Sequence, residues 1–567
     1  MLKRVSLLWA VCFLSGFLSS QTASLEISGE PGARAIFARY FQNRCGLHYQ
    51  WGEDRSSSFH LSYRPALPFS GTESRGTGDE RLGTVERSDR EASEQILGRL
   101  PLLLVVNFWN PVSTLSLPEL EAILSGEITN WSSVGGADLP IKVVAYAAGG
   151  YPRLPGPSLV AQLVPDQQAM VAAVAGDRQA LGVITWPAVH PEVKVLTLET
   201  VNPAWVESDH ALEEYPLWTD LVLTTSRRQG FRDWLNGNWW RAFRFQRELQ
   251  KSYHPGKILS APAPLVFTAV GDIMLAREVA KTSVARGDYC YPFRRTVEVI
   301  RRSTLAFANL EGPLSDRGRQ LNMFRADPRF IEGLLYAGFD VLSLANNHIM
   351  DYGTVALVDT MERLAEKGLH YVGADANLAR ARQGCLITAN GLKVGFLAYT
   401  EVGPGFTYTR EPQHWIATAE LPGVVPARAD YLRKDVARMR EQADLVFVSL
   451  HWGREYQHEP TQKQRILGQT ALAAGADLVI GHHPHVIQGV EFGSKGVIAY
   501  SLGNFIFDLT GEETKQGLIL EAACDKQGVR QVRFLPIEIR GVRPQMAEGR
   551  TARRIMELLD EVSAKLE

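Results

Sequence analysis

The stretch 265-LVFTAVGD-272 is apolar almost to its end, where Asp272 follows a glycine. Four later stretches have the same form: 304-TLAFANLE-311, 341-VLSLANNH-348, 445-LVFVSLHW-452 and 478-LVIGHHPH-485. Each is a short apolar run typical of a buried strand, and each ends in side chains that can bind a metal ion. Ligands of an α/β sheet collect beyond the carboxyl ends of its strands, so this recurrence predicts one shared site.

The size and charge of the chain narrow the possibilities. Its 567 residues exceed what one hydrophobic core usually covers, which predicts two or more domains. The 60 basic and 62 acidic side chains give a net charge of −2, which is ordinary for a globular protein. No basic stripe stands out, so we expect no nucleic-acid partner.

The first 23 residues have the layout of a secretory signal. Lys3 and Arg4 precede an apolar stretch over residues 5–18, which is followed by small and polar residues. That stretch is shorter than the roughly 20 residues that span a bilayer. We therefore expect an exported protein on the periplasmic or extracellular side of the cell envelope. No clean A-x-A cleavage site is present, so an uncleaved N-terminal anchor is the alternative.

Proline punctuation places the domain boundary at 254-HPGKILSAPAP-264. We expect a first domain over residues 24–258, a second over 264–544 and a C-terminal helix over 545–567. In that helix Ile555, Leu558, Leu559 and Val562 share one face, which favours packing on the sheet. The polar segment 70–94 predicts a surface loop.

The N-terminal half alternates strand-like and helix-like segments. A strand is predicted in 100-LPLLLVVNFWNPV-112 and a helix over residues 116–126. The segments 115–144 and 169–186 resemble the phosphate-binding, periplasmic-type solute-binding proteins, which implies a bilobal α/β domain. The segments 27-ISGEPGARA-35 and 146-YAAGGYPRLPG-156 lack the Ser and Thr pattern with which those proteins hold phosphate, so phosphate binding is not expected. A scaffold or partner-docking domain is the alternative.

Six motifs of the C-terminal half occur in order: AVGDIMLARE, FANLEGPLS, LSLANNHIMDYG, VSLHWGREY, GADLVIGHHPHVIQGVE and YSLGNFIFD. Together they closely resemble the CapA family, which is associated with poly-γ-glutamate capsule synthesis. The resemblance implies the calcineurin-like metallophosphoesterase fold, a four-layer α/β/β/α sandwich. It also implies a role in the biosynthesis of a capsule or another cell-envelope polymer. An envelope polymer or a phosphoester would be the substrate, and a membrane-bound capsule synthesis complex a partner.

The residue types at the strand ends predict the site. Carboxylate, carboxamide and imidazole groups form a mixed oxygen and nitrogen shell that suits one or two Mn, Fe, Zn or Mg ions. Carried over from the metallophosphoesterase pattern, the predicted metal ligands are Asp272, Glu311, Asn347, His451, His483 and His485. His348 would stay unligated and act as a general acid or a charge stabiliser. Residues predicted to contact substrate or to compete as ligands are Asn309, Asn346, His482 and Asn504, and Glu455 would line the cleft.

The sequence departs from the metallophosphoesterase pattern at its first motif. The usual D-x-H reads Asp272-Ile273-Met274, so one ligand of one metal is missing. A single strong metal site is therefore favoured over a two-metal cluster.

Each residue also has a simpler interpretation when taken alone. Asp272, Asn346 and Asn347 each precede a predicted helix and could be N-caps, and His451 could be a packed core histidine. Asp351 could orient a site histidine. Two functions remain open: a metal-dependent hydrolase, or a non-catalytic assembly or export factor of a capsule polymer complex.

Overall fold

The computed structural model describes residues 25–29, 49–51, 59–66, 92–147, 160–205, 212, 214–226, 265–404, 414–493 and 496–566. The predicted signal, the predicted boundary segment and most of segments 27–35 and 146–156 lie outside these ranges. So does the predicted loop 70–94, except its last residues, which begin strand β4 (Ala92–Pro101). Within the described ranges, no helix combines the length and apolar character that crossing a membrane requires.

The N-terminal half contains two five-stranded sheets, as expected for a bilobal α/β domain. One has the order β2-β1-β3-β12-β4 and the other β10-β5-β9-β7-β8. Besides β4, their strands are β1 (Leu25–Gly29), β2 (Tyr49–Trp51), β3 (Phe59–Ala66), β5 (Leu103–Asn107), β7 (Lys142–Tyr146), β8 (Val160–Val164), β9 (Ala180–Ile184), β10 (Val193–Val195) and β12 (Trp218–Ser226). A two-stranded sheet pairs β6 (Thr114–Leu115) with β11 (Thr197–Leu198).

The predicted helix over residues 116–126 is α3 (Leu117–Ser125). The Ser116 hydroxyl accepts a hydrogen bond from the Glu119 amide, and the Glu119 carboxylate accepts one from the Ser116 amide. This reciprocal capping box fixes the start of the helix. Gly126 ends it with a φ of 86°, a conformation that favours glycine. In the segment 169–186, which resembles the solute-binding proteins, α4 (Gln167–Ala175) is followed by β9.

The C-terminal half is built on two larger sheets. The eight-stranded sheet has the order β16-β15-β14-β13-β26-β27-β28, with β25 beside β13, and the six-stranded sheet has the order β18-β19-β21-β22-β24-β23. The first contains β13 (Leu265–Ile273), β14 (Leu305–Leu310), β15 (Val341–Ser343), β16 (His370–Val372), β25 (Asn504–Ile506), β26 (Gln516–Asp525), β27 (Gly528–Arg540) and β28 (Arg543–Met546). The second contains β18 (Cys385–Ala389), β19 (Leu392–Thr400), β21 (Leu445–His451), β22 (Leu478–His482), β23 (Val490–Gly493) and β24 (Gly496–Ala499).

Aromatic rings hold the two sheets face to face. Phe267 of β13 lies 4.5 Å from Phe447 of β21, measured between ring centroids, and Phe307 of β14 stacks 6.1 Å from Phe396 of β19. All four rings are buried, and fully burying such a side chain stabilises the fold by about 1.5–3 kcal/mol. Strands covered on both faces need apolar residues throughout, which explains the continuous apolar runs in the sequence.

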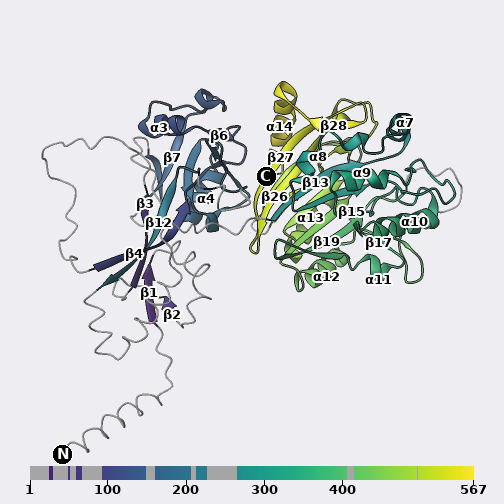
Figure 1. Ribbon diagram of the computed structural model, residues 1–567, viewed down its shortest axis with the longest axis horizontal. Helices are drawn as coiled ribbons and strands as arrows, with labels where there is room; N and C mark the ends of the chain where they lie inside the picture. Colours follow the sequence, from purple (N-terminus) through teal and green to yellow (C-terminus); the bar gives the residue numbers. More distant parts are fainter. Residues whose placement is uncertain are drawn as a thin grey trace, which may run out of the picture.

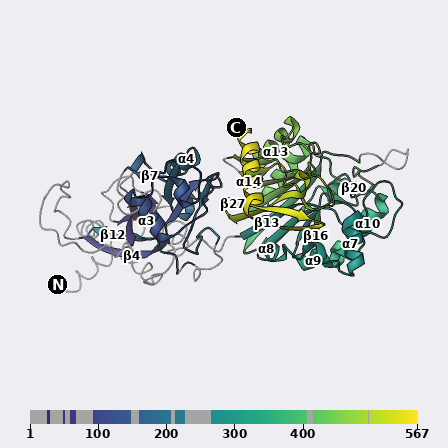
Figure 2. The same ribbon diagram turned by 90° about the horizontal axis from the view of Figure 1, so that it is seen from above.

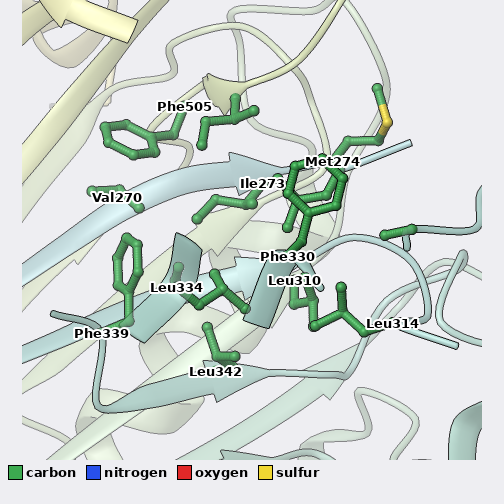
Figure 3. Packing of buried hydrophobic residues seen from close by; sticks show 14 of the residues in the cluster. Val270, Ile273, Met274, Leu310, Leu314, Phe330, Leu334, Phe339, Leu342 and Phe505 are labelled. Carbon is green, nitrogen blue, oxygen red and sulfur yellow. The ribbon is translucent and has the colours of Figure 1, made fainter. Parts of the chain in front are cut away.

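Helices cover the two outer faces. The eight-stranded sheet is covered by α7 (Arg277–Arg286), α8 (Val297–Arg301), α9 (Phe330–Ala337) and α10 (Gly353–Glu366), and the six-stranded sheet by α12 (Ala429–Arg440) and α13 (Gln462–Ala474). Figure 3 shows the packing of α9 on the eight-stranded sheet, where Phe330 and Leu334 of the helix lie against Leu310 and Leu342. The predicted four-layer α/β/β/α sandwich is confirmed.

The predicted C-terminal helix is α14 (Gly549–Ala564). Its residues Ile555 and Leu559 are buried in the cluster between the sheets, so the expected packing face is the observed one. Figures 1 and 2 show the two halves of the molecule side by side, with β27 on the side of the C-terminal half that faces the N-terminal half.

Candidate functional site

Five strand ends from both sheets meet at one edge of the sandwich. Strands β13, β14 and β15 are parallel neighbours in one sheet, and β21 and β22 are parallel neighbours in the other. Asp272 lies opposite Asn309 in its sheet, and His451 lies opposite His482 in the other. The structure thus brings together the predicted site residues, which the sequence had placed on separate strands.

Asp272 is the central acceptor of the site and is fully buried. Its carboxylate accepts hydrogen bonds from the Asn309 amide group at 2.8 Å and from the His483 backbone amide at 3.1 Å. The Nδ1 atoms of His482 and His485 lie 3.2 and 3.4 Å from its oxygens. Burial opposes the charge on Asp272, but these two imidazoles outweigh burial and hold the pKa well below its usual range.

Glu311 is buried beside Asp272 with only 1% of its surface exposed. Neither of its carboxylate oxygens has a hydrogen-bond partner among the described residues, and His485 Nε2 is 3.8 Å away. Burial, and next the charge of Asp272, raise the pKa of Glu311 well above its usual value. A buried carboxyl group without a partner is costly, so this position fits a bound cation.

Two overlapping groups of side chains can hold a metal ion. They are Asp272, Glu311 and His485, and Glu455, His483 and His485; within each group the ligand atoms lie within 4.8 Å of one another. Burial, with the neighbouring His485 imidazole, lowers the pKa of His483 to about 3, so its ring is neutral at pH 7 and can donate a lone pair. Burial also opposes the charge on His485, but the Glu311 and Asp272 carboxylates raise its pKa to about 9.

The Asn-Asn-His segment after β15 is tied to the site by hydrogen bonds. Asn346 donates to the Leu310 carbonyl at 2.8 Å and to Asn309 Oδ1 at 3.2 Å, and its own oxygen accepts from the His348 amide. Asn346 therefore shapes the loop with its polar atoms. Asn347 Oδ1 and His451 Nε2 are 2.8 Å apart, so these two predicted ligands are engaged with each other.

His348 is paired with the buried Asp351. Its Nδ1 atom lies 2.8 Å from Asp351 Oδ2, which also accepts a hydrogen bond from the Phe324 amide. The Phe324 ring lies 4.1 Å from the His348 ring, measured between centroids. Asp351 and Phe324 together fix the orientation of the imidazole and leave Nε2 as the nitrogen for a substrate.

His482 lies beside Asp272, and Asn504 contacts His485. Both ring nitrogens of His482 lack hydrogen-bond geometry with any described residue, although Nδ1 lies near Asp272. Asn504 Oδ1 lies 3.0 Å from His485 Nδ1, and the Asn504 amide donates to the Thr514 carbonyl at 2.9 Å. Asn504 begins β25 instead of ending a strand, and from there it orients His485.

Met274 shows why the D-x-H pattern is incomplete. Its side chain is fully buried in the apolar cluster under α9, next to Ile273 (Figure 3). The position that carries a ligand in the metallophosphoesterase pattern thus belongs to the core in this protein.

The N-cap interpretations are wrong. Helix α7 begins after Ala276 and α10 begins after Tyr352, so Asp272, Asn346 and Asn347 cap neither helix.

Glu455 is the residue that the predicted ligand set omitted. It follows β21 in the chain, and only the closure of the fold brings its carboxylate to His483 and His485.

Comparisons with known proteins identify the family of the chain. Residues 266–509 match the family of the bacterial capsule synthesis protein PGA_cap, and residues 68–149 match a PBP superfamily domain. The capsule biosynthesis protein CapA of Bacillus anthracis is 33% identical over 293 residues, which are 50% of this chain and 69% of that protein. The PGA biosynthesis protein CapA of Bacillus subtilis (strain 168) is 33% identical over 285 residues, 48% of this chain and 72% of that protein.

Among solved structures, an ABC-type phosphate transport receptor from Vibrio cholerae is similar at 20% identity with a TM-score of 0.26, covering 40% of this chain and 98% of that one. The identity and coverage of the two CapA proteins, together with the matched family, decide the assignment. The chain belongs to the family of bacterial capsule synthesis proteins, with a PBP-like domain in its N-terminal half.

Proposed function

We propose that the C-terminal domain is a metal-dependent hydrolase of phosphoesters that acts in the biosynthesis of a capsule, poly-γ-glutamate or another cell-envelope polymer. The observation that carries the proposal is the buried Glu311 carboxyl group, which has no hydrogen-bond partner among the described residues and lies beside Asp272 and His485. The biosynthetic role is inferred from the CapA relatives, whose names state it for those proteins.

The donor set fits a divalent cation with oxygen and nitrogen preferences: Mn, Fe, Zn or Mg. Asp272, Glu311, His483, His485 and Glu455 would hold the ion. Asn347 and His451 would belong to a second set of metal ligands once metal coordination replaces the hydrogen bond between them. A bound ion would polarise the phosphoryl group and neutralise its charge.

His348 would supply the proton for the leaving group. Asp351 accepts a hydrogen bond from Nδ1 and stabilises the imidazolium, so Nε2 can donate to the ester oxygen. Water adds to phosphorus and gives up one proton to solvent, the ester P–O bond breaks, and the alcohol leaves with the proton from His348. A proton from solvent then restores the imidazolium. Phe324 shields one face of the imidazole from solvent and keeps its position.

The test is hydrolysis of an aryl phosphodiester and an aryl phosphomonoester by the protein loaded with Mn²⁺. We expect His348→Ala to lower kcat by about 10²–10⁴-fold at equal metal content, the usual contribution of a positioned acid. His370→Ala, which removes an exposed histidine of β16, is the matched control and should retain activity. Wild-type protein that binds metal but hydrolyses neither ester would favour the alternative, a non-catalytic assembly or export factor.

The proposed setting is outside the cytoplasm. The signal-like first 23 residues and the PBP-like domain support export, and a membrane-bound capsule synthesis complex is the proposed partner. Detection of the protein in the periplasmic or extracellular fraction tests the location.

A further inference from the structure

Arg277 is a basic residue at the site that the sequence did not single out. It is the first residue of α7 and follows the loop that leaves the carboxyl end of β13, which carries Asp272. Its φ is 50°, a strained conformation for a side chain of this kind. Such strain persists where surrounding contacts fix the backbone, and it is concentrated at functional sites.

The arginine is joined to two site histidines through two aromatic rings. Its guanidinium carbon lies 5.1 Å from the ring centroid of Phe324 and 6.0 Å from that of Phe507. The Phe324 ring is 4.1 Å from His348, and the Phe507 ring is 4.8 Å from His485. Arg277 therefore lies one ring away from both the proposed proton donor and the proposed metal ligands.

Asp508 holds the guanidinium by one edge. Its carboxylate accepts hydrogen bonds from Arg277 Nε at 3.1 Å and from Nη2, and also from the Glu278 backbone amide at 3.0 Å. The Arg277 Nη1 group has no hydrogen-bond partner within the described ranges, and 35% of the side chain is exposed, against 6% for Asp508. Asp508 is thus a buried acid that orients Arg277, and the Nη1 edge of the guanidinium remains able to donate hydrogen bonds.

A plain surface ion pair does not account for these features. Such a pair contributes little to stability, and it needs neither a left-handed backbone nor two aromatic rings packed on the guanidinium. The site otherwise contains the acids Asp272, Glu311 and Glu455, which repel an anionic substrate. A cation beside them would offset that repulsion for one group of the substrate.

We propose that Arg277 is a specificity-determining residue that binds an anionic group of the substrate, a phosphoryl or a carboxylate group, and that Asp508 is its positioning residue. The proposal rests on the hydrolase function above and deepens it by assigning the substrate contact. Arginine suits this role because its planar fork can hold Asp508 on one edge and an oxyanion on another.

Calorimetric titration of the full chain loaded with Mn²⁺, with inorganic phosphate and with glutarate, tests the proposal by binding alone. We expect Arg277→Gln to weaken the binding of one or both anions by about 10- to 100-fold, the usual effect of losing a hydrogen bond to a charged group. The anion affinity of Arg277→Lys should lie between those of the wild type and Arg277→Gln, because lysine keeps the charge but lacks the planar fork of donors. Arg286→Gln, an exposed arginine of the same helix stacked on Tyr291, is the matched control and should bind as wild type.

The two probes separate the two chemistries. If Arg277→Gln loses affinity for phosphate alone, the group that Arg277 binds is a phosphoryl group. If it loses affinity for glutarate alone, that group is a carboxylate. In Arg277→Gln the buried Asp508 carboxylate loses its partner, and this unpaired charge would favour misfolding. The double variant Arg277→Gln/Asp508→Asn removes that charge, so an equal loss of anion affinity in it excludes misfolding as the cause. Binding of both anions to Arg277→Gln as tightly as to wild type, or to neither protein, overturns the proposal. Missing esterase activity would refute the hydrolase alone, since these titrations need no turnover.

Discussion

Strained backbone gathers around the candidate site at the scale of single residues. Six described non-glycine residues have positive φ, and four of them lie at the site: Arg277, His483, His485 and Tyr456, whose ring centroid is 6.2 Å from that of His485. The two histidines also contribute ligand atoms to the groups that can hold an ion. Hydrogen bonds such as that from the His483 amide to Asp272 hold these conformations in place. The sequence predicted the histidines from their place at the end of an apolar run and from the resemblance to the metallophosphoesterases, but a left-handed conformation leaves no signal in residues of these types.

Met274→His tests whether the missing ligand can be restored by sequence alone. The side chain lies in the apolar cluster under α9, so we expect an imidazole there to be buried without a partner. The free energy of unfolding should fall by about 2–4 kcal/mol in chemical denaturation, and the bound metal per chain should not rise in elemental analysis. Met323→His, at an exposed methionine, should change stability by less than about 0.5 kcal/mol. A second bound metal in Met274→His without loss of stability would contradict this placement.

At the scale of elements, the sequence identified the strands but not their assignment to sheets. Apolar runs revealed β13, β14, β15, β21 and β22 because each is buried, and burial leaves a local pattern. Whether β21 joins the sheet of β13 or forms another depends on pairing between distant segments, which no local pattern encodes. The N-cap interpretation of Asn346 and Asn347 failed for a related reason. Helix α10 begins at Gly353, and the Asn-Asn-His loop before it uses its polar atoms for the site. Glu455 reaches His483 and His485 only through such pairing.

The contact between β13 and β25 gives a prediction for an element. A Cβ atom on Gly271 would lie 2.1 Å from the Gly503 carbonyl oxygen, and the adjacent Asp272 amide donates to that same oxygen at 3.1 Å. Gly271→Ala should therefore push the strands apart and displace Asp272. We expect a loss of about 1–3 kcal/mol in the free energy of unfolding and weaker Mn²⁺ binding in a titration. Gly176→Ala, whose Cβ would lie 3.3 Å from the nearest atom, should leave Mn²⁺ binding unchanged. Wild-type affinity in Gly271→Ala would show that Asp272 does not depend on this strand contact.

At the scale of the whole molecule, the two halves are joined by polar contacts between β10 and β27 and by an aromatic contact between the end of β5 and β23. The Gln531 side chain, 1% exposed, donates to the Val193 carbonyl at 2.6 Å and accepts from the Val195 amide at 3.0 Å. Phe108 adds a ring contact of 4.7 Å with Phe492. These buried hydrogen bonds between a side chain and the backbone fix the position of one sheet of the PBP-like half on the sandwich. Domains joined only by small polar contacts usually move relative to one another.

Gln531→Leu tests whether this contact couples the halves. The substitution keeps the size of the side chain but leaves the Val193 carbonyl and the Val195 amide unpaired, at a cost of about 1–3 kcal/mol for each buried group. We expect the two calorimetric unfolding transitions of the variant to lie further apart in temperature than those of the wild type. Hydrogen exchange at the Val195 amide should be faster in the variant. Gln545→Leu is the matched control, because Gln545 bonds to Glu538 within the C-terminal sheet and should alter only one transition. Since Gln531 does not contact the candidate metal ligands, Mn²⁺ binding should survive. An unchanged melting profile together with protected Val195 would mean that the aromatic contacts suffice to hold the halves together.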